Sequence, residues 1–355
     1  MFVAGNGNGR VEVFKLNDDG TLAQPTATYI LGKPSEYARR SHAGAWSESQ
    51  TEFPGTLAID HTNQRLFLVD NATGQSLPGL GSQIMVFDIH PDRIETGEKV
   101  LAVLGQPHAD SKTIGLAANH VGRRLGLAVD ETNQRLFASD GSNNRVLIFD
   151  ISPNNFKTGM DASVVLGQEN FTSREPGLDP YRLSRPGALA YDPTNQRLFV
   201  SDNGNRRVMI FDVAPDRLQT FAAATDVMGQ PDFDTSEPRT NLTGFATGGL
   251  AYDDRTARLF IAEQVSRIEH MRISVYEVEL GTSLRAAVPM AILGKPGFDA
   301  YDPIVSREQS VWPRLGSASI DSERQLLVAT EGYPGGNRAI IWDISPERLR
   351  TGMPA

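Results

Sequence analysis

The chain has 355 residues, longer than a single undivided core usually becomes, so its length predicts either two domains or a repeat architecture. It contains no cysteine, which excludes disulfides and thiolate metal sites, and its formal charge of −9 argues against general attraction to nucleic acid or anionic membranes. The 33 glycines and 21 prolines predict many tight turns.

No apolar run approaches the ~18 residues needed to cross a bilayer, so no membrane association is expected. The first residues, MFVAGNGNGRVEVF, lack the basic and apolar regions of a signal peptide and have the pattern of two strands instead. Disulfide bonds indicate an oxidising compartment, but a chain without cysteine gives no such indication, so the localisation stays open.

One phrase, DETNQRLFASDGSNNRVLIFDISP at 130–153, recurs with small changes along the chain. Its unit contains four short apolar segments in a fixed order, which we call a, b, c and d: LAVD, RLFASD, RVLIFD and VVLGQE. These segments are rich in Val, Ile, Leu and Phe and are bounded by Gly, Asn, Asp or Pro, as is typical of β-strands. In chain order, the first unit has b, c and d without a, and the last has a, b and c without d.

The spacing of the units predicts the fold. The aspartates that end the a segments are 70, 62, 61 and 68 residues apart, at Asp60, Asp130, Asp192, Asp253 and Asp321. Four antiparallel strands per unit of about 60 residues is the pattern of a β-propeller blade. Six copies of segment c therefore predict an all-β chain, a β-propeller with six blades of four-stranded antiparallel sheet.

We expect one propeller domain over 1–355, with units at about 1–34, 53–107, 123–170, 185–232, 246–297 and 314–355. The count of segments predicts 22 strands, so the first and last blades are expected to be incomplete. Two explanations remain open: the chain is a segment of a longer protein, or the fold closes with incomplete blades.

The recurring polar letters are interpreted as turn chemistry. In the D-x-T-N-Q-R turn between a and b, we expect the asparagine to adopt a positive φ. The positions concerned are Asn63, Asn133 and Asn195. Between b and c, Asp140 with Arg145 and Asp202 with Arg207 are predicted to form cross-strand ion pairs or turn hydrogen bonds. Because the repeat supplies these pairs several times, a structural role is favoured over a catalytic one.

The phrases GLAVDETNQRLFASDGSNNRVLIFD and GALAYDPTNQRLFVSDNGNRRVMIFD resemble NHL repeats, and the resemblance covers nearly the whole chain. It implies a propeller of about six blades that serves as a binding platform, for which we expect a small molecule, which could be anionic, a glycan or a protein partner as the ligand. Related six-bladed families include enzymes, so the resemblance predicts the fold much more narrowly than the function.

Propeller strands alternate in direction, so the b–c and d–a connections share one rim, and the long irregular loops fall on it. Binding groups usually lie on such loops, and we place the site there. Seven residues before the a-segment aspartates stand three arginines, Arg123, Arg185 and Arg314, whose guanidinium groups would match an anionic ligand. The alternative is that each arginine pairs with an aspartate or with carbonyl groups of its own loop.

Histidines and aromatic residues complete the candidate ligand-binding set on these loops. The histidines are His42 and His120, of which His120 lies just before Arg123. No H-x-H, H-x-x-x-H or H-E-x-x-H spacing occurs, so the sequence predicts no metal site from histidines. Trp46, Tyr181 and Trp312 offer aromatic surface for a sugar or another flat ligand, or could instead plug the mouth of the channel.

Two classes of function remain open. The first is a non-catalytic binding propeller whose ligand lies on the rim with the long loops. The alternative is a metal-dependent hydrolase or lyase with its site in the central channel, as the resemblance to six-bladed lactonases and to an amidating lyase implies. No cofactor is identified from the residues, no catalytic residue is assigned, and a channel calcium or zinc ion stays open. RNA binding, known for NHL domains, is disfavoured because acidic residues on the same loops offset the arginines.

Overall fold

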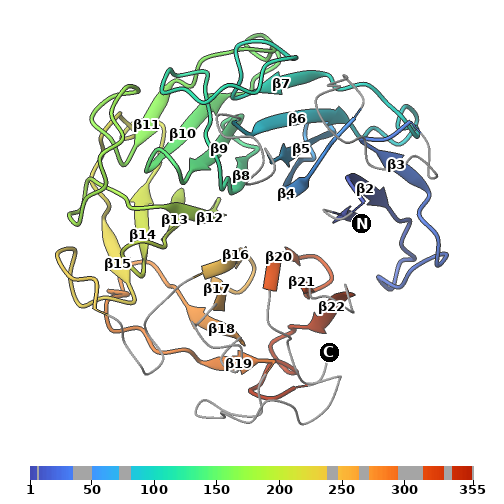
Figure 1. Ribbon diagram of the computed structural model, residues 1–355. Helices are drawn as coiled ribbons and strands as arrows, with labels where there is room; N and C mark the ends of the chain where they lie inside the picture. The colour runs from blue at the N-terminus through green and yellow to red at the C-terminus, as the bar shows by residue number, and fades with distance from the viewer. Residues whose placement is uncertain are drawn as a thin grey trace. The chain divides into compact units, whose positions relative to one another are not determined.

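The computed structural model describes residues 1–5, 8–34, 50–71, 81–237, 247–263, 272–294, 315–331 and 338–353. Within these ranges the chain is all-β and forms six antiparallel sheets, the blades of a six-bladed β-propeller (Figure 1). No helix in the described part of the chain is long and apolar enough to cross a membrane.

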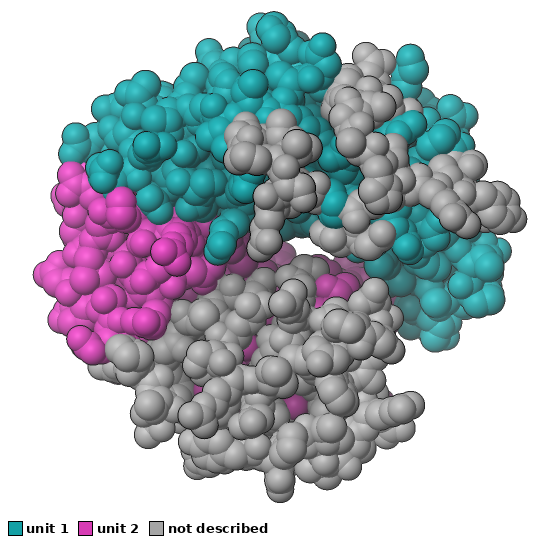
Figure 2. Space-filling model, viewed as in Figure 1, with its two compact units in different colours: residues 1–165, 169–175 teal, residues 166–168, 176–355 magenta. Residues whose placement is uncertain are grey.

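The chain forms two compact units (Figure 2). Unit 1 comprises residues 1–165 and 169–175, and unit 2 comprises residues 166–168 and 176–355. The strands of the first three sheets belong to unit 1, except that the last residue of β11 falls in unit 2, and the strands of the other three sheets belong to unit 2.

The strands of unit 1 follow the predicted segments closely. The first sheet contains β1 (Phe2–Gly5), β2 (Arg10–Val13) and β3 (Tyr29–Leu31). The second contains β4 (Pro54–Asp60), β5 (Arg65–Asp70), β6 (Gln83–Asp88) and β7 (Ala102–Leu104). The third contains β8 (Leu127–Asp130), β9 (Arg135–Asp140), β10 (Arg145–Asp150) and β11 (Val164–Leu166).

The strands of unit 2 repeat the same order. The fourth sheet contains β12 (Pro186–Asp192), β13 (Arg197–Asp202), β14 (Arg207–Asp212) and β15 (Asp226–Met228). The fifth contains β16 (Thr247–Asp253), β17 (Arg258–Glu263), β18 (Arg272–Glu277) and β19 (Ala291–Leu293). The sixth contains β20 (Leu315–Asp321), β21 (Leu326–Glu331) and β22 (Arg338–Asp343). The described residues therefore confirm three-stranded first and last blades.

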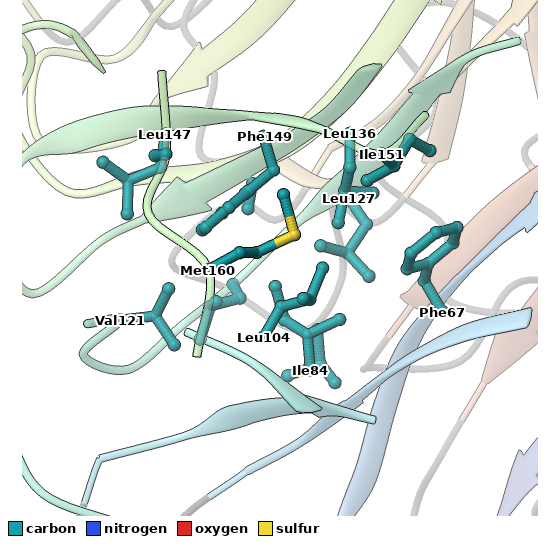
Figure 3. Packing of buried hydrophobic residues seen from close by; sticks show 14 of the residues in the cluster. Phe67, Ile84, Leu104, Val121, Leu127, Leu136, Leu147, Phe149, Ile151 and Met160 are labelled. Atoms are coloured by element: carbon teal, nitrogen blue, oxygen red, sulfur yellow. The ribbon is translucent and has the colours of Figure 1, made fainter. Parts of the chain in front are cut away.

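Within each unit, the hydrophobic core lies between successive blades. In unit 1, Phe67 of β5 and Ile84 of β6 pack against Leu127 of β8, Leu136 of β9 and Phe149 of β10 (Figure 3). Phe67, Ile84, Leu136 and Phe149 are completely buried. Each strand thus contributes side chains to a neighbouring sheet, which explains why both faces of the b and c segments are apolar.

A Thr-Gly pair in the c–d connection ties each of several blades to the outermost strand of the blade before it. Val103 N–H of β7 donates to Thr158 Oγ1, and Gly159 N–H donates to the Val103 carbonyl, both at 3.1 Å. The same two contacts join Thr96 and Gly97 to Ile30, and Thr351 and Gly352 to Ile292. These bonds pair one N–H and one C=O group on the outer edge of strand d, the edge that faces no further strand of its own sheet.

The positive φ predicted for the turn asparagines was wrong by one residue. The left-handed residues are Gln64, Gln134 and Gln196, with φ of 53°, 52° and 52°. Asn133, for example, donates its backbone N–H to Asp130 Oδ1 at 3.0 Å and its side-chain amide to Asp130 Oδ2 at 2.9 Å. Because the asparagine closes the turn through these bonds, the next residue adopts the left-handed conformation that returns the chain to strand b.

Candidate functional site

A completely buried ion pair lies at the b–c end of the fourth blade. Arg207 Nε is 2.7 Å from Asp202 Oδ2, and neither side chain is exposed. The remaining guanidinium nitrogens donate to loop carbonyls: Nη1 to Phe233 at 2.5 Å, and Nη2 to Asp179 at 3.0 Å and Arg182 at 3.2 Å. One arginine therefore holds the backbone of two d–a loops, one at Asp179 and Arg182 and the other at Phe233.

Arg145 has the same role in the third blade. Its Nε is 3.1 Å from Asp140 Oδ2, again with both side chains buried. Its Nη1 donates to the carbonyls of Leu116 and Phe171 at 2.8 and 2.6 Å, and its Nη2 to the carbonyl of His120 at 2.8 Å. The predicted cross-strand pairs are thus confirmed, and the structure adds that they position the d–a loops.

The aspartates of these pairs hold the chain as it enters strand a. Asp202 Oδ1 accepts the N–H of Ser184 at 2.6 Å, and Asp140 Oδ1 accepts the N–H of Gly122 at 3.1 Å. Burial raises the pKa of both carboxyl groups, and the paired arginines oppose this shift. Each buried carboxylate is thus a hydrogen-bond acceptor that depends on its arginine to remain charged.

The second blade forms an equivalent pair with a residue from a different segment. Gln83 occupies the position of Arg145 and Arg207, and it donates to Asp70 Oδ2 at 3.3 Å. The positive charge comes from Lys112 in the following d–a loop, whose Nζ lies 3.1 Å from Asp70 Oδ2 and 3.6 Å from Glu52 Oε2. The Lys112 carbonyl also accepts the N–H of Gly81 at 2.8 Å, so the loop is anchored at the same place.

The glutamine of the recurring G-Q-P phrase is a positioning residue that the sequence analysis missed. Gln106 donates to the carbonyls of Ser82 and Thr113 at 2.7 and 3.1 Å and is completely buried. Gln230 donates to the corresponding carbonyls of Arg206 and Glu237 at 3.2 and 3.0 Å. Its recurrence directly after the glycine of segment d was the available signal, because a repeated buried amide implies a repeated hydrogen bond.

The candidate arginines have different surroundings. Arg123 is half-buried, and its backbone N–H donates to Ser142 Oγ at 2.6 Å. Arg185 is exposed and has a φ of 52°, a backbone conformation that it shares with Arg124 (φ 64°) and not with Arg123. Arg123 belongs to unit 1 and Arg185 to unit 2.

His120 is half-buried against its own loop. Its Nδ1 lies 2.9 Å from Asn119 Oδ1, and its ring covers Gly115 so closely that an added Cβ there would lie 2.4 Å from the imidazole Cδ2. Burial lowers the pKa of His120, with a further contribution from the positive charge of Arg145. The imidazole is therefore held in the neutral form near pH 7.

Tyr181 lies against the c–d connection of the fourth blade. Its side chain is 43% exposed, and its ring centroid is 5.0 Å from that of Phe221. The other candidates, His42, Trp46, Trp312 and Arg314, lie outside the described residues. Among the residues that the structure describes, no three His, Asp or Glu side chains gather where they could hold a metal ion.

No protein-family model and no curated protein matches this sequence. The structure is similar to the periplasmic gluconolactonase PpgL of Pseudomonas aeruginosa, with 13% identity and a TM-score of 0.51, over 96% of this chain and 80% of that one. Solved structures titled as a mitotic checkpoint complex (13% identity, TM-score 0.48, 96% and 70% covered) and a nidogen/laminin complex (12%, 0.45, 96% and 91%) are also similar. At these identities the gluconolactonase similarity shows the β-propeller fold, and activity must be argued from the site.

Proposed function

We propose that this protein is a non-catalytic binding propeller, similar to NHL-repeat proteins, that holds its ligand on the surface formed by the b–c and d–a connections. The ligand is a small anionic molecule, a glycan or a protein partner. The proposed contact residues are those that the sequence identified, Arg123, Arg185, Arg314, His120, His42, Trp46, Tyr181 and Trp312.

The observation that carries the proposal is the way in which buried ion pairs position these loops. Arg145 and Arg207 are completely buried, yet most of their guanidinium N–H groups donate to backbone carbonyls of d–a loops and not to neighbouring strands. Desolvating a guanidinium and a carboxylate is expensive. A loop that is already held in one conformation loses little conformational entropy when a ligand binds. A preorganised surface therefore binds more tightly than a flexible one.

Charge favours an anionic group in the ligand. Arg124 and Arg185 both combine a left-handed backbone with an exposed side chain, each just before strand a of its blade. Guanidinium groups present a planar fork that matches carboxylate or phosphate. Arg206, an exposed residue in the b–c connection of the same blade as Arg185, adds positive charge there.

A thermal-shift screen with carboxylates, phosphates and oligosaccharides tests the proposal. We expect at least one ligand to raise Tm, and Arg185→Gln to lower its affinity about tenfold because one charge-assisted contact is lost. Arg93→Gln is the matched control, since Arg93 is also exposed but lies in the c–d connection of the second blade and pairs with Asp88. Stoichiometric calcium or zinc in protein purified without chelator, together with substrate turnover, would contradict the proposal and favour the hydrolase or lyase.

A further inference from the structure

Phe221 has a backbone conformation that three other blades give to glycine. It occupies the position that follows the threonine in the c–d connection, where the corresponding residues are Gly97, Gly159 and Gly352 with φ of 83°, 76° and 75°. Phe221 adopts a φ of 61°. A bulky residue in the left-handed region is strained by about 1 kcal/mol or more. The phenylalanine therefore occupies this position despite backbone strain that glycine would avoid.

The Phe221 ring forms one contiguous cluster with two residues of the d–a loop. Its centroid lies 5.0 Å from that of Tyr181, with an angle of 31° between the ring planes. The Arg182 guanidinium carbon lies 5.9 Å from the Phe221 centroid. Tyr181 is 43% exposed and the Arg182 side chain 38%, so the cluster is open to solvent.

The surrounding backbone makes this cluster rigid. Asp179 Oδ1 accepts the N–H groups of Tyr181 and Arg182 at 2.7 and 2.8 Å, and Asp179 Oδ2 is 3.2 Å from Arg182 Nη1. The Ala224 N–H donates to the Pro180 carbonyl at 2.8 Å, which joins the two loops beside the rings. These bonds place the aromatic pair, a guanidinium and a carboxylate in one fixed arrangement.

We propose that Tyr181, Phe221 and Arg182, with Asp179, form a glycan-binding platform on the fourth blade. The aromatic pair supplies a flat apolar surface for the C–H face of a sugar ring. Arg182 donates and Asp179 accepts, which matches hydroxyl groups that can do both. The inference rests on the proposed binding function. It extends the ligand-binding surface from the d–a loop to the c–d connection of the fourth blade and assigns carbohydrate as the ligand there.

A protein partner fits the cluster less well. Hot spots for protein binding are desolvated and ringed by further contact surface. Here Arg182 and Asp179 already pair with each other, and the neighbouring Gln219 is an exposed polar residue. A ligand rich in hydroxyl groups can bond to this pair without separating its charges.

Affinity electrophoresis tests the platform. The protein is run in native gels that contain xylan, β-glucan, mannan, polygalacturonate or alginate. We expect at least one polysaccharide to retard the wild type, Tyr181→Ala to weaken that binding about tenfold or more, and Tyr181→Phe to retain it because the ring face is unchanged. Val288→Ala, at a side chain 71% exposed in the c–d connection of the fifth blade, is the control and should bind as the wild type does.

Phe221→Gly separates binding from folding. Because the equivalent residues in three other blades are glycines, we expect this variant to unfold at the same or a higher temperature than the wild type while it loses glycan binding. Binding unchanged by both Tyr181→Ala and Phe221→Gly overturns the platform but leaves the binding function in place. If no polysaccharide retards the wild type, the glycan assignment is wrong, and the thermal-shift screen decides the wider proposal separately.

Discussion

Arg207 and Asp202 face each other at the ends of two adjacent strands, with 2.7 Å between Nε and Oδ2 and neither side chain exposed. The pair is separated by only five positions in the sequence, but the guanidinium also binds carbonyls of Asp179 and Phe233 in two different loops. A local turn motif therefore organises parts of the chain that are distant in sequence.

Arg207→Met is expected to lower the free energy of unfolding by about 3–5 kcal/mol, because it leaves the Asp202 carboxylate buried and unpaired. The measurement is urea denaturation followed by circular dichroism. Arg217→Met is the control: Arg217 pairs with Asp212 at 2.6 Å but is 58% exposed, so we expect a loss of less than about 1 kcal/mol. Equal losses in the two variants would show that the buried pair has no special role.

Lys112→Met should lower the free energy of unfolding by about 2–4 kcal/mol, since Asp70 loses the cation that neutralises it. Adding Gln83→Arg should restore at least half of this loss, because position 83 corresponds to Arg145 and Arg207. Lys157→Met, at an exposed lysine, is the matched control and should leave stability unchanged. A double variant no more stable than Lys112→Met would refute the equivalence of the two cations.

Gly159→Ala and Gly281→Ala separate steric overlap from backbone strain. Both glycines have a positive φ, 76° and 84°, but a Cβ at Gly159 would lie 2.4 Å from the Pro107 carbonyl oxygen, whereas nothing lies within 4 Å of one at Gly281. We expect Gly281→Ala to lower the free energy of unfolding by about 1 kcal/mol and Gly159→Ala by about 3 kcal/mol or more. If the two variants lost similar amounts of unfolding free energy, the connection around Gly159 would be able to move away from the Pro107 carbonyl at little cost.

Glu98 should make stability fall as pH rises from about 4.5 to about 7. Burial raises the pKa of its carboxyl group to about 7, with a further contribution from Asp88, while its ordinary value is 4.5. Between these values the unfolded chain has released the proton that the folded chain retains, so deprotonation favours unfolding. Because the carboxyl group is only half-buried, solvent screening reduces the effect to about 1 kcal/mol.

Glu98→Gln should remove this pH dependence, measured as the difference between the wild-type and variant free energies of unfolding at pH 5 and pH 8. Taking the difference between wild type and variant cancels the contributions of all other groups that titrate between pH 5 and pH 8. A wild type and a Glu98→Gln variant with parallel pH profiles would contradict the prediction.

The repeating strands, the turns and the buried Asp–Arg pairs could be predicted because each depends on residues a few positions apart. Strand b ends and strand c begins around a short turn, so Asp140 and Arg145 meet in any antiparallel pairing of that register. The same reasoning from neighbouring residues placed the positive φ one residue too early, at the asparagine. It could not show that the asparagine side chain binds the preceding aspartate, leaving the left-handed conformation to Gln134.

By itself, then, the sequence determined the six-bladed fold, since short apolar segments and turn chemistry act over short distances and recur along the chain, with six copies of segment c. The tertiary structure alone decided which distant residues meet: Lys112 at Asp70, and Tyr181 at Phe221. The physical reason is that long irregular loops have no periodic pattern. Their course is set by buried charges that require partners and by backbone carbonyls that require donors, and these become visible only when the blades are packed.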